Sequence, residues 1–231
     1  MMGSVIMLGR ETRVTYPAVS STFANNTWED IIAACQKKQV PESWTVGNQK
    51  SITIGGAEYL VDIIGKNHDY YADNSGLAPL TFQLHDCHKN TAWIKNEAAS
   101  GNWESSDMRA TYIPDIKNQM PEAVKAALRK VNKLTSNGTV LIDPVEDDLF
   151  LLSEVEVYGT AANSFSGEGE QYGFYKAGGS KIKNLNGSPH IWWLRSPYNW
   201  GSKDFVAVQA DGTQNIFRVN NWYGVAPAFC F

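Results

Sequence analysis

The last forty residues, from Trp192 to Phe231, constrain the fold more than any other part of the sequence. Two apolar segments, WWLRS and FVAV, predict core strands that are joined by the loop 197–204 and have alternate residues facing the interior. The last segment, GVAPAFCF, is expected to return beside an N-terminal hairpin. Arg195 could pair with a buried carboxylate or point to solvent. The predicted framework consists of Trp192, Trp193, Leu194, Phe205, Val206, Val208, Val225, Phe229 and Phe231.

The residues between these apolar positions have a composition typical of a binding surface. Tyr and Trp give rigid contact area, while Ser, Asn and Gly give adaptable hydrogen bonding, as in antibody paratopes. Four of the eight tryptophans fall in the last forty residues, and exposed aromatics often anchor interfaces. We predict ligand contacts at Tyr198, Asn199, Trp200, Ser202, Asp204, Gln209, Asn215, Phe217, Asn221, Trp222 and Tyr223, with Trp200, Trp222 and Tyr223 as anchors. Alternatively, Phe217 and Trp222 belong to the core.

Composition and charge narrow the class of protein. A chain of 231 residues with 43% hydrophobic content can bury a core as one globular domain. Lys and Arg number 20 against 24 Asp and Glu, without a basic run, which argues against a nucleic-acid partner. Cys35, Cys87 and Cys230 are too widely spaced for a disulfide framework and are expected to be buried. Because no run approaches the ~20 apolar residues of a membrane span, we expect a soluble chain, whose location on a phage virion or bacterial cell surface stays open.

Local patterns predict several elements. The segment TWEDIIAACQKK favours a helix with Asn26 or Thr27 as its N-cap, and SITIGGAEYLVDIIG favours a hairpin with a glycine turn. The clearest helical period covers 121–134. Strands are expected at TVLI, LFLLS and VEVYG, a helix over about 85–93, and a long functional or surface-covering loop over 161–189.

The sequence contains a few residues of the types that carry catalysis or bind metals. His85, Cys87 and His88 lack a second cluster of ligands, so no metal is expected there. The acidic residues Asp143, Glu146, Asp147 and Asp148 lack the pattern of a calcium loop, which favours a solvated turn. Cys230, with His190 far upstream, is expected to be buried and inert. The sequence contains no nucleophile elbow, P-loop or dinucleotide motif, and we predict no catalytic residue, no metal and no cofactor.

Several stretches together resemble one known family. They are IIGKNHD, LTFQLHD, NWESSDMR, PEAVKAALRKV, LFLLSEVEVYG, GEGEQYGFY, WWLRSP and the final GV-x-PAF. From about residue 40 onward the chain is similar to a bacterial and phage family of unknown function, many of whose members resemble the variable proteins of diversity-generating retroelements. In those proteins an error-prone reverse transcriptase rewrites C-terminal codons at adenines. The resemblance implies an α+β, C-type-lectin-like fold, with mainly antiparallel sheets, two or more flanking helices and long irregular loops.

The resemblance also implies an organisation and a function. We expect a lead-in over 1–25 and a single domain over 26–231, whose variable region at about 192–231 displays a diversified surface to a protein or cell-surface ligand. Tyr, Asn, Ser and Asp, which are products of adenine-targeted change, are enriched between Tyr198 and Tyr223. One alternative is a phage tail or surface adhesin of fixed specificity. Another is an enzyme on a formylglycine-generating-like scaffold with a cleft under 161–189, although the sequence shows no matching pair of active cysteines. Membrane insertion is not expected, and the oligomeric state stays open.

Overall fold

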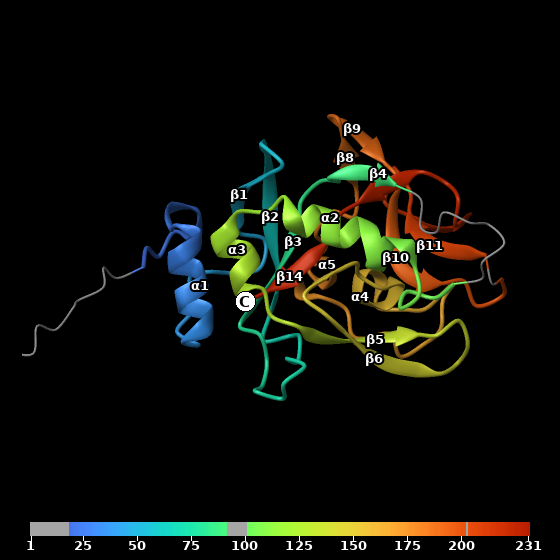
Figure 1. Ribbon diagram of the computed structural model, residues 1–231, viewed down its shortest axis with the longest axis horizontal. Coiled ribbons are helices and arrows are strands. Elements are labelled where there is room, and N and C mark those ends of the chain that lie inside the picture. Colours follow the sequence, from blue (N-terminus) through green and yellow to red (C-terminus); the bar gives the residue numbers. More distant parts are fainter. Residues whose placement is uncertain (1–18, 92–100, 202) are drawn as a thin grey trace, which may run out of the picture.

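The computed structural model describes residues 19–91, 101–201 and 203–231, and two five-stranded sheets dominate it (Figure 1). The first sheet has the order β1-β2-β3-β14-β7 and the second the order β12-β11-β10-β13-β4. Among the described strands every pairing is antiparallel except the parallel pairing of β10 with β13. The first sheet comprises β1 (Gln49–Ile54), β2 (Ala57–Lys66), β3 (Leu80–Leu84), β14 (Ala228–Cys230) and β7 (Leu149–Phe150). The second comprises β12 (Gln214–Arg218), β11 (Asp204–Val208), β10 (Trp192–Pro197), β13 (Tyr223–Val225) and β4 (Lys89–Thr91).

Short helices and two small hairpins complete an α+β fold with mostly antiparallel sheets. The α-helices are α1 (Trp28–Gln36), α2 (Ile113–Asn118), α3 (Glu122–Ala127), α4 (Glu154–Tyr158) and α5 (Gly173–Lys176). A 3-10 turn (Phe23–Asn25) precedes α1, and a π-helical turn (Met108–Tyr112) precedes α2. The hairpins are β5 (Val131–Ser136) with β6 (Ile142–Asp147), and β8 (Lys183–Leu185) with β9 (Ser188–His190).

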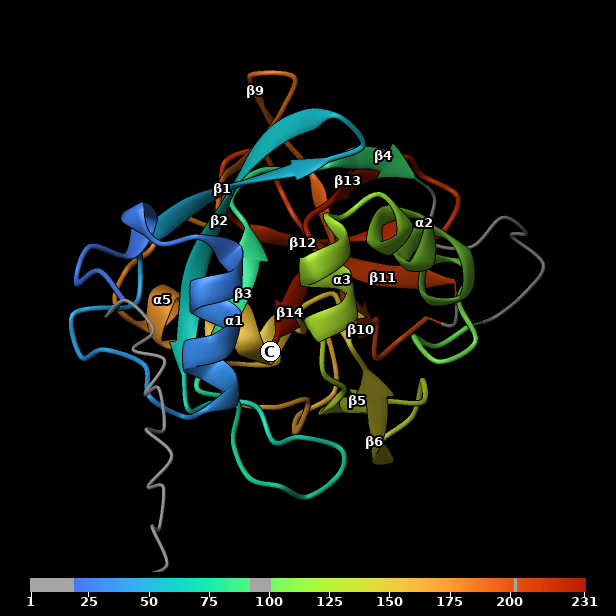
Figure 2. The same ribbon diagram turned by 60° about the vertical axis from the view of Figure 1, so that its left-hand side comes forward.

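Helix α1 forms where the sequence predicts it. Thr27 is the N-cap: its side chain accepts a hydrogen bond from the Asp30 amide, while the Asp30 carboxylate accepts one from the Thr27 amide. This reciprocal capping satisfies two amides that the first helical turn leaves unpaired. The Trp28 ring packs against Phe82 and Phe229, so α1 lies against the β3–β14 part of the first sheet (Figure 2).

The predicted hairpin is confirmed as β1 and β2. Ile54 pairs with Ala57 across a two-residue turn in which Gly55 and Gly56 have φ angles of +58° and +83°. Two successive positive φ angles match the twist of a hairpin and favour glycine at both positions. The C-terminal strand β14 joins this same sheet, but it pairs with β3 and β7 and is separated from the hairpin by β3.

The helix predicted over 121–134 is wrong in its second half. Helix α3 ends at Ala127, Leu128 has extended backbone angles, and the chain continues into β5. Val131, Lys133 and Thr135 are buried while Leu134 is exposed, which is the two-residue period of a strand. Tertiary contacts therefore outweigh the local helical spacing, because Lys133 has ion partners only in the interior that the strand faces.

Three other predicted elements are also corrected. The segment VEVYG is helical as α4, because Ser153 and Glu156 form a capping box and Gly159 ends the helix with a φ of +77°. Residues 89–91 form β4 rather than a helix, and residues 92–93 of that prediction lie outside the described residues. The acidic segment is no solvated turn, since Asp143 to Asp147 belong to β6 and Asp147 is buried. Of the predicted strands TVLI and LFLLS, only Ile142, Leu149 and Phe150 lie in strands.

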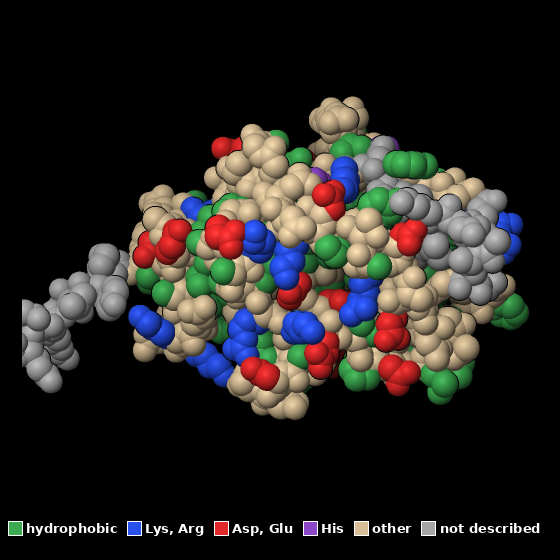
Figure 3. All heavy atoms as spheres, in the orientation of Figure 1, with side chains coloured by type: hydrophobic (Ala, Val, Ile, Leu, Met, Phe, Trp, Pro, Cys, Tyr) green, Lys and Arg blue, Asp and Glu red, His purple; other side chains and the backbone are tan. Residues whose placement is uncertain are grey.

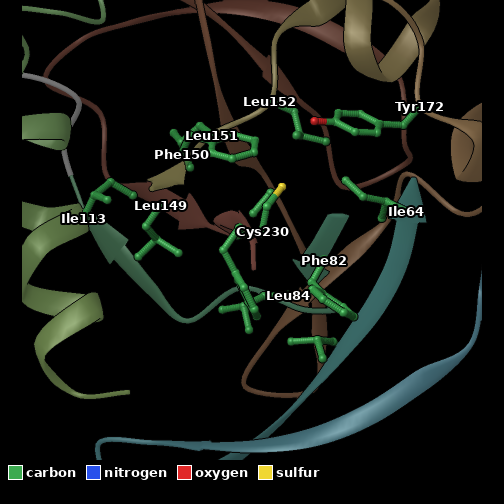
Figure 4. Packing of buried hydrophobic residues seen from close by; sticks show 14 of the residues in the cluster. Ile64, Phe82, Leu84, Ile113, Leu149, Phe150, Leu151, Leu152, Tyr172 and Cys230 are labelled. Atoms are coloured by element: carbon green, nitrogen blue, oxygen red, sulfur yellow. The ribbon is translucent and has the colours of Figure 1, made fainter. Parts of the chain in front are cut away.

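One hydrophobic core runs from Phe23 to Phe231 and lies between the elements of both sheets. Figure 4 shows part of it, where Phe82 from β3, Leu149 and Phe150 from β7, and Cys230 from β14 meet. Phe23 belongs to this core although the sequence analysis assigns it to the lead-in. All six residues of β10 are buried, so the expected alternation of inward and outward residues does not occur on that strand. Helix α4 and strand β5 both contact β10, and other segments cover it elsewhere.

Candidate ligand-binding surface

Strands β10, β11 and β12 form the platform that carries the predicted contact residues. All nine predicted framework residues are buried, which confirms that part of the sequence analysis. Strand β11 is buried from Phe205 to Val208, whereas no residue of the edge strand β12 is fully buried. In Figure 1 this platform lies at the end of the molecule opposite α1.

Two loops leave the platform at the same end, and we call them the end loops (198–203 and 219–222). Asp204 at the start of β11 pairs with Arg218 at the end of β12, so the chain before β11 and the chain after β12 emerge side by side. The Val219 amide donates a hydrogen bond to the Lys203 carbonyl at 3.0 Å. Arg218 Nε also lies 3.5 Å from Asp204 Oδ1. These contacts join the bases of the end loops.

Each end loop presents an exposed tryptophan. Trp200 is 84% exposed and Trp222 is 65% exposed, whereas Trp44, Trp103 and Trp193 are buried. The alternative that Trp222 belongs to the core is therefore wrong. Exposing a large aromatic side chain to water is unfavourable unless a partner covers it, so this pair is the most specific feature of the surface.

Tyr223 and Phe217 are half-buried and pack together beside the platform. Their ring centroids are 4.9 Å apart in an edge-to-face arrangement, and the Tyr223 ring also lies 5.1 Å from that of Trp193. Phe217 thus belongs neither to the core nor to a free loop. Burial raises the pKa of Tyr223, in agreement with a ring that is partly covered by its neighbours. Part of the Tyr223 ring, which the sequence predicts to anchor a ligand, therefore contacts Phe217 and Trp193 inside the protein.

Asn199 holds an end loop in place. Its amide N–H donates to the Asn163 carbonyl at 3.0 Å, and its side-chain Nδ2 donates to the Ser164 carbonyl at 3.1 Å. Tyr198 closes the same loop by donating its amide N–H to the Asp204 carbonyl at 2.9 Å. The side chain predicted for ligand contact at Asn199 therefore has an internal partner, which connects the end loop to the 159–172 segment.

The remaining predicted contacts are distributed over the hairpin. Asn221 lies in an end loop, where its amide donates to the Arg218 carbonyl. Gln209 lies at the opposite end of the β11–β12 hairpin, where its Nε2 donates to Thr213 Oγ1 at 2.9 Å, so the structure does not bring it to the end loops. Asn215 is exposed in the middle of β12, and Ser202 lies outside the described residues. The end loops and strand ends bring together Tyr198, Asn199, Trp200, Asp204, Asn221 and Trp222.

Arg218 is a candidate that the sequence prediction missed. Its side chain is 58% exposed and stands at the base of the end loops, paired with Asp204. Arginine is enriched at interface hot spots because its planar guanidinium stacks and forms several hydrogen bonds. Only the register of β11 against β12 places it beside Asp204, and a single sequence does not reveal that register.

Arg195 on the platform strand β10 is buried. Of the two possibilities that the sequence left open, it therefore pairs with a buried carboxylate and does not point to solvent. It forms a two-point ion pair with Glu156 and donates through Nε to Thr135 Oγ1 at 3.1 Å. Its guanidinium also donates to the carbonyls of Leu151 and Leu134 at 2.9 and 3.0 Å. These bonds join β10 to α4 and β5 and fix the strand that supports the end loops.

The same network extends to Lys133 and Asp69. Lys133 Nζ lies 2.6 Å from both Asp69 Oδ1 and Glu156 Oε1, and it donates to the Tyr172 hydroxyl at 2.9 Å. The hydroxyls of Thr81 and Tyr172 also donate to Asp69. Burial opposes ionisation of Asp69 and Glu156, but Lys133 beside the first and Arg195 beside the second hold the pKa of each below its usual value.

Glu168 brings the predicted 161–189 loop into the interior. Its carboxylate accepts a hydrogen bond from the Ser136 amide at 2.9 Å and another from the Ser196 hydroxyl of β10. Burial raises the pKa of Glu168. The segment is therefore partly structural rather than only a surface cover, and it also contains α5, β8 and β9.

Two of the residues considered for metal binding, His85 and Asp147, have other partners. His85 Nδ1 lies 2.9 Å from Asp62 Oδ2, and this hydrogen bond raises the pKa of His85. Asp147 accepts hydrogen bonds from Trp103 Nε1 and Arg109 Nε at 2.6 and 2.7 Å. Over the described ranges 19–91, 101–201 and 203–231, no group of three or more potential metal-binding side chains occurs.

Basic and acidic side chains are interspersed on the face shown in Figure 3.

A cavity of about 500 Å³ lies beside Gly169 and Glu170, at the place where the enzyme alternative expected a cleft. Asp69, Lys133 and Glu156 are among its lining residues, but the interior network already uses their polar atoms. The three cysteines are buried and free, and burial raises the pKa of Cys35 and of Cys87 to about 12. Asp69 and Glu156 are therefore no unpaired bases and the cysteines no activated thiolates, while His68, which stacks on Tyr172, and the exposed Glu170 also belong to the ionisable lining of the cavity.

Fold and surface together define an α+β domain in which a buried strand platform carries two solvent-exposed loops. The chain belongs to the family described as Domain of unknown function (DUF6273), whose model matches residues 73–231. That match covers the whole platform and both end loops. No curated protein and no solved structure matches the chain. In the described part of the chain, no helix has the length and apolar character needed to cross a membrane.

Proposed function

We propose that this chain is a non-enzymatic binding protein that displays a diversified surface on a C-type-lectin-like scaffold, as the variable proteins of diversity-generating retroelements do. The end loops, with Tyr198, Asp204 and Arg218 beside them, form the centre of that surface. Its partner is a protein or another ligand on a cell surface.

The observation that carries the proposal is that the residues that hold the fold are buried, whereas the tryptophans proposed to contact a ligand lie in exposed loops. Trp200 and Trp222 extend into solvent from adjacent loops, while every predicted framework residue is buried. Side chains can be exchanged at the exposed positions without loss of core packing, which is the property that a diversified surface requires. The buried network around Arg195 supports it by fixing β10 independently of the loop sequences.

Two features of the fold favour the proposed scaffold. The C-terminal strand β14 joins the sheet that begins with the first hairpin, and the Tyr71 hydroxyl donates to the carbonyl of Phe231. The second sheet carries most of the proposed variable region on four adjacent strands, β12, β11, β10 and β13. The pairing of Asp69, Lys133 and Glu156 with one another beside the cavity favours binding over catalysis.

The decisive experiment is a binding screen of the intact protein against surface proteins of bacteria, followed by the double variant Trp200→Ala/Trp222→Ala. We expect the double variant to stay folded and to lose its partner, because truncation of an interface anchor costs about 2 kcal/mol or more. Leu60→Ala is the control, since Leu60 is a 43% exposed hydrophobic residue on β2, in the other sheet, and lines neither the end loops nor the cavity beside Glu170. Retention of the partner by the double variant would contradict the proposal.

The encoding DNA separates a diversified protein from an adhesin of fixed specificity. Diversification predicts a nearby repeat that differs from the gene only at adenines, with sibling copies that vary only within 198–223. Sibling copies that vary evenly along the chain, without such a repeat, would favour the fixed adhesin.

A further inference from the structure

The cavity of about 500 Å³ lies between the β2–β3 connection and β5, away from the end loops. In Figures 1 and 2 that connection hangs below the first sheet beside β5. The two are joined because the Asn132 amide donates to the Tyr70 carbonyl at 2.9 Å and Tyr71 forms a bridge with Val131. The volume lies within the range of roughly 300–1,000 Å³ typical of small-molecule sites.

Three asparagine side chains at the cavity wall are open to a ligand, since Asn67 and Asn74 are exposed to solvent and Asn132 is half-buried. Within the part of the chain that the structure describes their side chains form no hydrogen bond. A primary amide offers both a donor and an acceptor, which matches a hydroxyl group because a hydroxyl also does both. Three such amides around one cavity favour a ligand with several hydroxyls.

The charges of the cavity argue against an ionic ligand. Asp69, Glu156 and Glu170 line it against the single cation Lys133, which disfavours an anion. The oxygens of Asp69 and Glu156 accept hydrogen bonds from Lys133, Arg195 and other internal donors, so they are not available to a ligand cation. The exposed Glu170 carboxylate is the charged acceptor that remains at the wall, and a single exposed carboxylate accepts hydrogen bonds from hydroxyl groups without forming a cation site. A neutral polar ligand remains the best match.

The rim provides an apolar surface for such a ligand. Tyr70 is 65% exposed and Leu134 is 43% exposed, and both line the cavity. Leu134 pairs with Pro144 across the β5–β6 hairpin, and Pro144 lines the cavity as well. Aromatic and aliphatic groups beside amides complement a ring that has C–H groups on its face and hydroxyls at its edge.

We infer that this cavity binds a neutral saccharide of one or two rings, through the three asparagine amides and the exposed Tyr70 ring. The site is separate from the end loops, so it does not depend on the proposed function. It adds a fixed specificity, since its residues lie outside the segment 198–223.

The test is a 1H–15N NMR titration of the 15N-labelled full chain with maltose, cellobiose, lactose and N,N′-diacetylchitobiose, with inorganic phosphate and spermidine as charged controls and with binding measured as shifts of the amides that line the cavity. We expect at least one disaccharide to bind with a dissociation constant of roughly 0.1–5 mM, and neither charged control to bind. Tyr70→Ala and Asn132→Ala should each weaken that binding by about fivefold or more, since each removes a favourable contact. Both variants should keep the wild-type circular dichroism spectrum.

The double variant Trp200→Ala/Trp222→Ala separates the two sites. We expect it to bind the disaccharide as the unaltered protein does, even though its protein partner is lost. The inference is overturned if none of the four disaccharides binds, if phosphate or spermidine binds as well, or if neither Tyr70→Ala nor Asn132→Ala weakens binding. It is also overturned if the double variant loses the disaccharide, which would move saccharide binding to the end loops.

Discussion

The guanidinium of Arg195 and the carboxylate of Glu156 form a two-point ion pair in the interior, with N–O distances of 2.5 and 3.0 Å. Arg195 belongs to the platform strand β10, and Glu156 belongs to the short helix α4. Glu156 also contacts Lys133 at 2.6 Å, so two cations share its carboxylate. The loss of one partner would leave an uncompensated charge away from water.

We expect Arg195→Met to lower the free energy of unfolding by about 3–5 kcal/mol, because it leaves the Glu156 charge with only Lys133 in the interior. Urea unfolding followed by circular dichroism measures the change. Arg218→Met is the matched control, since its ion pair with Asp204 is exposed and should cost less than about 1 kcal/mol. Equal losses in the two variants would contradict the assigned role of the buried pair.

Substitution of tryptophans tests the division between platform and end loops. Trp193→Ala removes a fully buried ring and should cost about 3–5 kcal/mol of stability. Trp200→Ala removes an exposed ring and should change stability by no more than about 0.5 kcal/mol. Thermal and urea unfolding of the two variants provide the comparison. A large destabilisation by Trp200→Ala would show that this side chain supports the fold.

The contribution of Glu168 to stability should depend on pH with the opposite sign to the contributions of Asp69 and Glu156. Its pKa is raised in the folded protein, so its contribution to stability is complete below the unfolded pKa and is lost as pH rises through the folded pKa. The variant Glu168→Gln stays neutral at every pH. The free energy of unfolding of the unaltered protein minus that of Glu168→Gln should therefore decrease as pH rises above 4.5, the ordinary pKa of a glutamate side chain. Urea unfolding from pH 4 to 8 measures it, and a difference that rises with pH would refute the assignment.

Three histidines, His85, His88 and His190, should titrate in a defined order. The hydrogen bond with Asp62 raises the pKa of His85 above 6.5, whereas burial lowers the pKa of His88 and of His190 below it. NMR titration of the imidazole signals should find that His85 titrates at a higher pH than His88 and His190. Asp62→Asn removes the negative partner and should lower the pKa of His85. An unchanged His85 titration in that variant would mean that the interaction does not form in solution.

Local sequence was sufficient for elements whose termini are specified by side chains next to them. The capping box of Thr27 with Asp30 begins α1, and the Gly55–Gly56 turn sets the β1–β2 hairpin. Both depend on hydrogen bonds and backbone angles within a few residues. The same kind of signal was present at Ser153 and Glu156, but the apolar character of VEVYG suggested a strand.

The end of α3 could not be predicted in this way. The spacing from Val124 to Leu134 is helical, yet the chain changes to a strand because β6 pairs with Val131–Ser136 and Lys133 meets Asp69 and Glu156. These partners lie far away in the sequence, and no local period contains them. The same limit applies to Glu168, which a polar and glycine-rich segment gave no reason to place in the interior.

For the candidate surface, the sequence by itself determined which residues form the buried framework and which segment carries the polar and aromatic residues between them, because burial of Trp, Phe and Val follows from their hydrophobicity. Only the tertiary structure decided which contact residues meet. The pairing of Asp204 with Arg218 brings the end loops together, while the length of the hairpin places Gln209 at its far end. Strand register is fixed by contacts between distant segments, so the position of each polar side chain on the surface depends on the whole fold.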